Sequence, residues 1–208
     1  MAANDEYEQR LWTSDCKYVC GVDEVGCGSL MGPVTMACVV FSANIDYKTL
    51  LKGLNDSKQK TSEQREELYI KIKQYALDWS VAEASVEEID QYNIYWAKWM
   101  AARRALTKLK IQPDHILMDG NHKIPEISIP QTAIVKGDSK SISIAGASIL
   151  AKVDRDRYIV ELAKEVVPEY GWKDNKGYYT EEHIAALKKY GKTQWHRAKY
   201  VSKFIGGW

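Results

Sequence analysis

Hydrophobic residues run together or alternate with polar ones in five short segments, which we expect to be β-strands. Apolar runs of this length, bounded by glycine, proline or charged residues, are typical of strands that are buried on one or both faces. The expected strands cover residues 18–23, 34–41, 79–84, 115–118 and 132–135. Longer segments with helical periodicity separate several of them, so the pattern predicts an α/β fold with a mixed sheet flanked by helices.

Capping residues and apolar periodicity predict the main helices. Thr61, followed three residues later by Gln64, forms a capping box that opens the first helix. Residues 86–109 are expected to be helical in two pieces, with a break near Asn93. One further helix is expected from about residue 142 to 166, ending before Pro168, and another over residues 181–190.

Length and composition fit one large domain. The chain has 208 residues, of which 45% are hydrophobic and 27% charged. No apolar run approaches the roughly 20 residues that span a bilayer, which excludes a membrane-spanning helix. We predict a polar N-terminal extension over residues 1–16 and a single domain over residues 17–208, with a helical C-terminal segment from about 168 to 208.

The cysteines indicate a reducing environment. All four lie in the first fifth of the chain, at Cys16, Cys20, Cys27 and Cys38. The first two have a spacing seen in zinc sites, but no second Cys or His pair follows at suitable spacing. Reduced thiols in a cytoplasmic protein are the prediction.

Basic residues are concentrated in two segments, although the net charge is only +1. Residues 92–113 and 188–203 contain lysines and arginines without any acid, and the second segment also contains Tyr190, Trp195 and Tyr200. Basic side chains among aromatic ones suit a surface that contacts phosphates and stacks on bases. A solvated helix face explains the first segment equally well, whereas the second indicates a nucleic-acid partner.

Acidic residues stand at the ends of three expected strands. Asp23 and Glu24 end the first strand, and Asp119 and Asp138 follow two later ones. Each position also fits an ordinary turn. If these strands are neighbours, four carboxylates meet at one edge of the sheet, where they repel one another and raise one another's pKa values. A hard divalent cation such as Mg²⁺ or Mn²⁺ relieves that repulsion.

Side chains that are adjacent on a regular strand point to opposite faces of the sheet. We therefore expect the chain to bend at Asp23 and Glu24 if both are to share one site. Gly26 and Gly28 follow directly and make such a bend possible.

The glycine-rich turn after these acids carries a resemblance to a known family. Asp23-Glu24-Val25-Gly26-Cys27-Gly28 resembles the Asp-Glu-x-Gly-x-Gly signature of ribonuclease HII. Further matches follow in the order of that family, over about residues 17–204: Asn55-Asp56-Ser57-Lys58, Met118-Asp119-Gly120, Lys136-Gly137-Asp138, residues 144–153, Arg155-Asp156, Lys176-Gly177-Tyr178, Thr180-Glu181-Glu182-His183 and His196-Arg197.

This resemblance implies a ribonuclease H-like fold and a catalytic domain over residues 17–208. It implies an endonuclease that cleaves RNA in RNA–DNA duplexes, including on the 5′ side of single ribonucleotides embedded in DNA. Cleavage would use two divalent ions, Mg²⁺ or Mn²⁺, and leave a 3′-hydroxyl and a 5′-phosphate. We expect a cytoplasmic monomer whose partners are RNA–DNA hybrids and DNA containing ribonucleotides.

The resemblance also assigns roles by position. The family's metal-binding and catalytic carboxylates correspond to Asp23, Glu24, Asp119 and Asp138. The loop that senses the ribose 2′-hydroxyl corresponds to Gly26, Cys27 and Gly28, and the tyrosine that packs on the sugar corresponds to Tyr178. We also expect substrate contacts from Ser148 and from Lys58, which equally fits a solvated loop lysine.

Three positions depart from the family pattern, since Ser29 stands where proline is common and Gly146 where alanine is, and the third is the one that bears on substrate binding. Cys27 stands where the family usually has an arginine between the two glycines. A neutral thiol cannot donate the charged hydrogen bonds that an arginine gives a phosphate. The sequence therefore predicts weaker substrate capture than in a relative with arginine at this position.

Three other functions fit parts of the sequence. They are a module that binds hybrids without cutting them, another nuclease of the same fold such as ribonuclease HIII or a junction resolvase, and a metal-dependent phosphatase for small molecules. The full set of four carboxylates, the short segment before the first strand and the basic, aromatic C-terminal segment favour ribonuclease HII.

Overall fold

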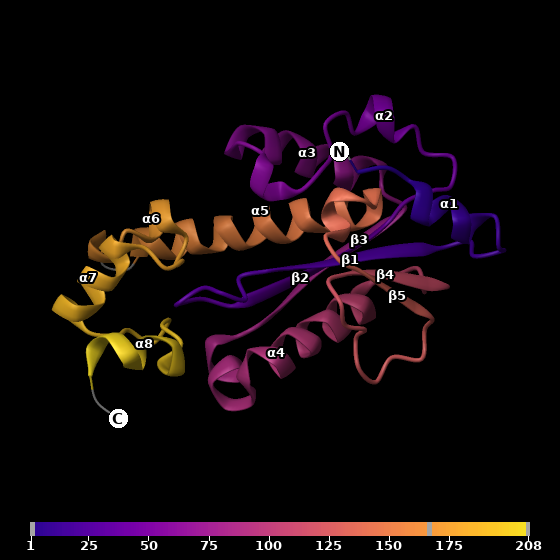
Figure 1. The fold of residues 1–208 in the computed structure, drawn as a ribbon. Helices are drawn as coiled ribbons and strands as arrows, with labels where there is room; N and C mark the ends of the chain where they lie inside the picture. Colours follow the sequence, from indigo (N-terminus) through magenta and orange to yellow (C-terminus); the bar gives the residue numbers. More distant parts are fainter. Residues whose placement is uncertain (1–2, 166–167, 207–208) are drawn as a thin grey trace.

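A five-stranded mixed sheet with helices on both faces forms the body of the protein (Figure 1). The computed structural model describes residues 3–165 and 168–206. In the order β3-β2-β1-β4-β5, the first three strands pair antiparallel, and β1, β4 and β5 run parallel. The strands are β1 (Val19–Val25), β2 (Val34–Val40), β3 (Asp78–Ala84), β4 (His115–Asp119) and β5 (Gln131–Ile134). All five predicted strands are confirmed.

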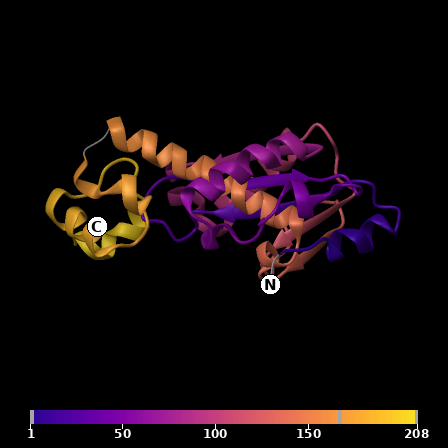
Figure 2. The same cartoon turned by 90° about the horizontal axis from the view of Figure 1, so that it is seen from above.

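Helices cover the sheet in two layers and extend beyond it at one end. In Figures 1 and 2 the long α5 crosses the sheet beside α3, α4 lies on the opposite face, and α6 to α8 gather at the far end of α5. The helices are α1 (Glu6–Trp12), α2 (Tyr47–Leu50), α3 (Ser62–Tyr75), α4 (Val86–Lys108), α5 (Ile142–Glu165), α6 (Trp172–Asn175), α7 (Glu181–Tyr190) and α8 (Ala198–Ile205), with 3-10 turns η1 (Ser57–Gln59), η2 (Gly137–Ser139) and η3 (Pro168–Tyr170).

Local sequence signals account for the helix boundaries. The Thr61–Gln64 capping box opens α3 as predicted. The predicted break in α4 is at Asn93, which has a φ of 66° and whose side chain accepts a hydrogen bond from the Tyr95 N–H at 2.9 Å. The predicted end of α5 at Val166 lies outside the described residues.

The two faces of the sheet pack against different helices. On one face, Val22 and Met118 join a buried cluster with Trp99 of α4. On the other face α5 crosses β1 so closely that a Cβ at Gly21 would lie 2.0 Å from the carbonyl carbon of Ser143. Only glycine permits this approach, and it fixes α5 directly over the strand that carries the acidic pair.

The N-terminal segment contains a helix that the sequence analysis did not predict. Glu8 of α1 is fully buried, and one of its oxygens accepts hydrogen bonds from the Ser141 hydroxyl at 2.5 Å and from the Ser143 N–H at 2.9 Å. Ser141 in turn accepts from the Ile144 N–H at 3.2 Å. The carboxylate of Glu8 therefore stabilises the first turn of α5, where the unpaired N–H groups of a helix favour negative charge.

Two sequence expectations concern the environment of the protein. Within the described residues, no helix combines the length and the apolar character needed to cross a membrane. No disulfide joins the four cysteines, all of which are free thiols.

We expect Glu8→Ala to lower the free energy of unfolding by about 1–3 kcal/mol, because it removes two hydrogen bonds from a buried helix start. Glu6→Ala, an exposed change on the same helix, should alter it by less than about 0.5 kcal/mol. Urea unfolding of both variants measures this, and equal small losses would contradict the role of Glu8.

Candidate active site

Three of the predicted acidic side chains lie at one edge of the sheet because their strands are parallel neighbours. Val22 of β1 is paired with Met118 of β4, so Asp23 and Asp119 occupy the next position on adjacent strands. Asp138 lies in η2, which follows β5 after Val135 and Lys136, and β5 is parallel to β4. The sheet thus brings together carboxylates that are up to 115 residues apart (Asp23 and Asp138).

Burial and mutual repulsion make these carboxylates harder to ionise. Asp23 is 5% exposed, and burial followed by the charge of Asp119 raises its pKa well above the usual range. Burial also raises the pKa of Asp119, against the effect of the Gly137 N–H, which donates to it at 2.6 Å. Burial and the charge of Asp119 raise the pKa of Asp138 to about 6.

Glu24 lies beside this group but on the other face of β1. The strand continues without a bend through Glu24 to Val25, and the turn begins at Gly26, which has a φ of 90°. The expected bend at Asp23 and Glu24 is therefore wrong. Both side chains nevertheless line the same cavity, because β1 ends there and the edge of the sheet is open to both faces.

The carboxylates take protein partners in this structure. Asp23 accepts from the Glu24 N–H at 2.7 Å, and Glu24 pairs with Lys98 of α4 at 3.2 Å. Within residues 3–165 and 168–206, no three His, Cys, Asp or Glu side chains are already grouped to hold a metal ion. The donors still fit a hard cation, because they are all carboxylate oxygens, and burial followed by mutual repulsion raises the pKa values of Asp23, Asp119 and Asp138.

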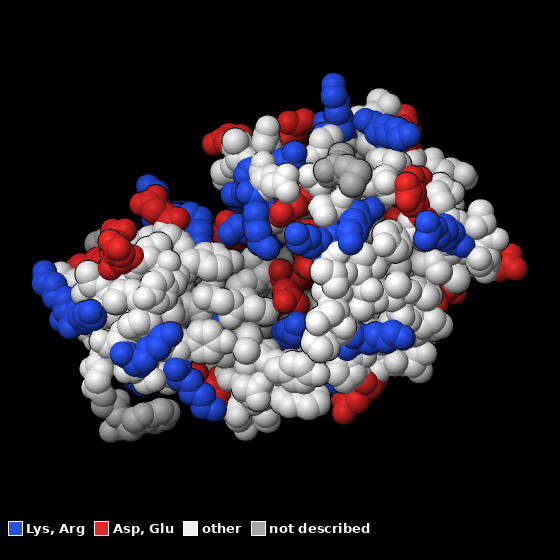
Figure 3. Space-filling model, viewed as in Figure 1, with Lys and Arg blue, Asp and Glu red and all other residues white. Residues whose placement is uncertain are grey.

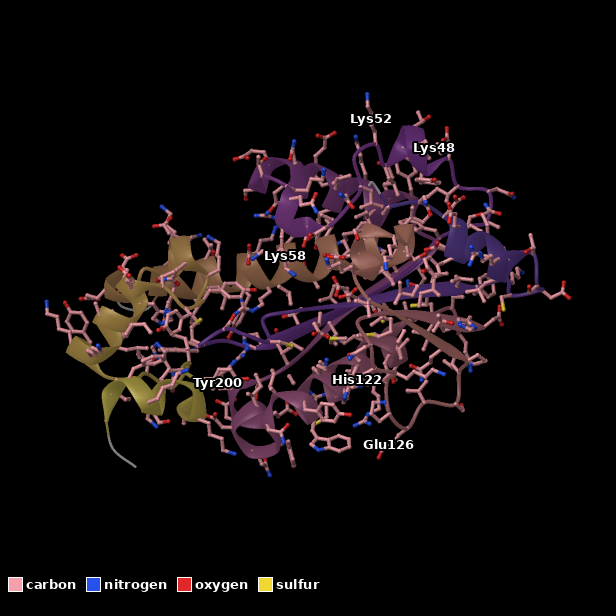
Figure 4. All side chains as sticks on the ribbon, viewed as in Figure 1. Lys48, Lys52, Lys58, His122, Glu126 and Tyr200 are labelled. Atoms are coloured by element: carbon pink, nitrogen blue, oxygen red, sulfur yellow. The ribbon has the colours of Figure 1, made fainter. Side chains whose placement is uncertain are left out.

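A cavity of ≈ 280 Å³ lies beside the carboxylates and is lined by Asp23, Glu24, Val25, Ser57, Lys58, Ser148, Lys152 and Tyr178. Of these, Lys58, Ser148 and Tyr178 are predicted substrate contacts. The Ser148 hydroxyl donates to Ser57 at 2.8 Å, which joins α5 to the exposed Lys58 turn. Lys152 lies over the Tyr178 ring, with 5.1 Å between its Nζ and the ring centroid. In Figure 4, Lys58 lies on the α5 side of β1 and Tyr200 on the opposite side.

Two buried arginines hold the loop of Gly26, Cys27 and Gly28. Arg155 of α5 donates to the Ser29 hydroxyl at 2.8 Å and to the Lys176 carbonyl at 3.1 Å, so it ties this loop to the turn that carries Tyr178. Arg197 donates to the Cys27 carbonyl at 3.0 Å. The two arginines therefore fix the loop through the Cys27 carbonyl and through the Ser29 hydroxyl that follows it.

Residues near the C-terminus support Tyr178. His183 is fully buried, and its ring contacts the Tyr178 carbonyl at 3.0 Å and the His196 ring at 3.0 Å. Burial lowers the pKa of both histidines, that of His196 to about 3. Their buried hydrogen bonds indicate a structural role.

Sequence reasoning missed two residues of the site. Lys98 contacts Glu24 across 74 positions in the chain, and its only sequence signal is its place in the basic segment 92–113. Lys152 contacts Asp156 at 2.9 Å and also lines the cavity.

A mixed sheet of this order, with carboxylates at the ends of its parallel strands and helices on both faces, defines a nuclease of the ribonuclease H-like class. The crystal structure of ribonuclease H2 from Pyrococcus horikoshii matches with a TM-score of 0.74 and 28% identity, covering 90% of this chain and 97% of that one. The chain belongs to the ribonuclease HII family, whose model, described as Ribonuclease HII, matches residues 20–204.

Curated relatives agree with this assignment. The ribonuclease HII of Caldicellulosiruptor bescii is 44% identical over 200 residues, which cover 96% of this chain and 94% of the relative. That of Clostridioides difficile is 47% identical over 199 residues, covering 96% and 76%. The protein is therefore a type 2 ribonuclease H, a hydrolase that acts as an endonuclease on RNA–DNA substrates, and the phosphatase alternative is wrong.

Asp138→Asn should stabilise the protein in EDTA by about 1 kcal/mol near neutral pH, after allowance for solvent screening of this half-exposed group. An acid with a raised pKa in the folded state favours folding when protonated, so stability falls as pH rises from the ordinary pKa of 3.8 to about 6. Urea unfolding at pH 5 and pH 7 measures this. The exposed change Asp15→Asn is the control, and a destabilised Asp138→Asn protein would contradict the argument.

Proposed function

We propose that this protein is a divalent-metal-dependent endonuclease that cuts on the 5′ side of ribonucleotides in RNA–DNA hybrids and of single ribonucleotides embedded in DNA, leaving a 3′-hydroxyl and a 5′-phosphate. The observation that carries the proposal is the convergence of Asp23, Asp119 and Asp138 on one sheet edge with raised pKa values. Together with Glu24 they form an acidic centre between basic and aromatic walls.

The four carboxylates would hold two Mg²⁺ or Mn²⁺ ions. Such ions, when bound, lower the pKa of a water nucleophile and stabilise charge on the leaving oxygen of a phosphodiester. The contribution of the chain is to keep the oxygens in place, through the Glu24 N–H on Asp23 and the Gly137 N–H on Asp119. A bound cation would offset the repulsion among the four carboxylates, which supports the proposal that they bind cations.

The walls of the cavity would position the nucleic acid. Lys58 and Lys152 supply positive charge on the α5 side. Tyr178 presents an aromatic ring to the cavity, and His183 fixes the backbone of Tyr178 through its carbonyl group. A flat ring suits packing against a sugar. Ser148 lines the same cavity and is 5% exposed. Its hydrogen bond to Ser57 keeps the Lys58 turn close to α5.

The loop of Gly26, Cys27 and Gly28 would recognise the ribose 2′-hydroxyl through its backbone. The Cys27 carbonyl of this loop accepts a hydrogen bond from Arg197. Arg155 packs so closely against Gly26 that a Cβ at this position would lie 2.4 Å from Arg155 Nε. A backbone fixed in this way can distinguish a hydroxyl from a hydrogen, because its polar groups cannot move to compensate for a missing partner.

Asp23→Asn and, separately, Asp119→Asn should abolish measurable cleavage while the fold is retained, since each removes one charged ligand. The substrates are a duplex with one embedded ribonucleotide and an all-DNA duplex, each with Mg²⁺ and with Mn²⁺. Substrate binding in EDTA should persist and weaken steeply with salt, because basic side chains contact phosphates without metal. Near-normal turnover by either variant at saturating Mg²⁺ would refute the assignment.

Tyr178→Ala should reduce cleavage at a single embedded ribonucleotide more than cleavage of a continuous hybrid, because one sugar contact matters most where only one ribose is present. Tyr179→Ala is the matched control, since Tyr179 is 61% exposed and packs against Phe204. Comparison of kcat/KM on the two substrates measures the effect. Equal losses on both would mean that Tyr178 has only a structural role.

A further inference from the structure

The side chain of Glu24 lies between a lysine and the loop thiol. Lys98 Nζ donates to Glu24 Oε2 at 3.2 Å, and Cys27 Sγ donates to Glu24 Oε1 at 3.6 Å. One carboxylate therefore brings an ammonium group from α4 next to the loop that, by resemblance, senses the ribose.

Lys98 is held in place by its surroundings. Its side chain is 18% exposed, and its Nζ lies 4.3 Å from the ring centroid of the buried Trp99. The break at Asn93 starts a new helical segment one turn earlier, which fixes the register of α4 at Lys98. An ammonium group has three N–H donors, so the contact with Glu24 leaves donors available to a second anion.

Positive charge thus flanks the carboxylates from both faces of the sheet. Lys58 and Lys152 line the cavity on the α5 side, and Lys98 comes from α4 on the other side. Figure 3 shows acidic atoms on the floor of a hollow near the middle of the view, with basic side chains on both sides of the hollow. A nucleic-acid strand crossing the hollow meets a cation before and after the acidic centre.

The loop itself supplies no charge at this place. Cys27 has a thiol in place of a cationic group, and this thiol donates to Glu24 at 3.6 Å. Arg197 is near, but it is fully buried and its donors are occupied by the carbonyl groups of Cys27, Gly32 and Pro33. Lys98 is the partly exposed cation beside the loop.

We propose that Lys98 binds the phosphate next to the ribose-sensing loop and replaces the arginine that the ribonuclease HII family usually carries at position 27. The inference rests on the proposed function of the site. The thiol of Cys27 and the ammonium group of Lys98 contact the two oxygens of the same carboxylate, that of Glu24. The expectation of weak substrate capture, which considered Cys27 alone, is therefore replaced by one in which the cation comes from α4.

Binding in EDTA tests this without cleavage. Lys98→Met should weaken binding of a duplex with one embedded ribonucleotide about fivefold, and should reduce the slope of log affinity against log salt by about one. Lys98→Arg should keep both values. Lys108→Met is the matched control, because Lys108 lies near the end of the same helix and donates to the Val81 carbonyl.

Cys27→Arg provides the second half of the test. In the wild-type background it should not tighten binding, because Lys98 already supplies the cation. In the Lys98→Met background it should recover most of the lost affinity. Such non-additivity is expected of two groups that serve one contact.

Other outcomes would overturn the proposal. If Lys98 only neutralises Glu24, then Lys98→Met changes Mn²⁺ affinity measured by calorimetry but leaves EDTA binding and its salt slope unchanged. A Cys27→Arg change that tightens binding equally in both backgrounds would also overturn it. Failure of the proposed function is distinct, since it would appear as wild-type binding without salt dependence or as cleavage by Asp23→Asn.

Discussion

Repulsion among carboxylates buried at the end of a parallel strand pair is the constraint on which this structure depends. The pairing of Val22 with Met118 places Asp23 and Asp119 side by side. Apolar packing cannot relieve this, because burial raises the cost of each negative charge. Backbone N–H groups offset part of the cost, and the rest remains as raised pKa values. Without a cation, these carboxylates destabilise the folded protein. A cation that offsets their charge therefore binds with a gain in free energy.

The remainder of the fold holds this unfavourable arrangement in place. Gly21 lets α5 approach β1, and α5 carries Ser148 and Lys152 to the cavity and Arg155 to the loop. Glu8 stabilises the start of α5, a few residues after Asp138. One helix therefore connects the acidic turn, the basic wall and the ribose-sensing loop, so that displacement of α5 would disturb all three together.

The parts of the site that the sequence could predict are those encoded locally. Strands with buried faces appear as apolar runs, and Asp23, Asp119 and Asp138 follow such runs directly. The buried position of Glu8 was missed because an acidic, polar segment gives no periodic signal, and its burial depends on Ser141, 133 residues away. The expected bend after β1 was wrong because it assumed that a shared site requires a shared face. At an open strand end, side chains from both faces reach the same cavity.

Placement of the cation on α4 separates two tasks that a single loop residue would otherwise combine. In the proposed function, recognition of the ribose depends on backbone that Arg197 holds at the Cys27 carbonyl and Arg155 at the Pro33 carbonyl, and Cys27 adds no charge that could pull this backbone toward a phosphate. Lys98 instead lies on a helix packed against the sheet, with its Nζ over the Trp99 ring, so little side-chain freedom is left to lose when a phosphate binds. Lys98 forms an ion pair with Glu24, which belongs to the acidic centre. The positive charge proposed to attract substrate therefore also reduces the net negative charge of the site before cations bind. Affinity for nucleic acid and tolerance of the buried carboxylates are thereby linked through one side chain, while discrimination of the sugar stays with the backbone.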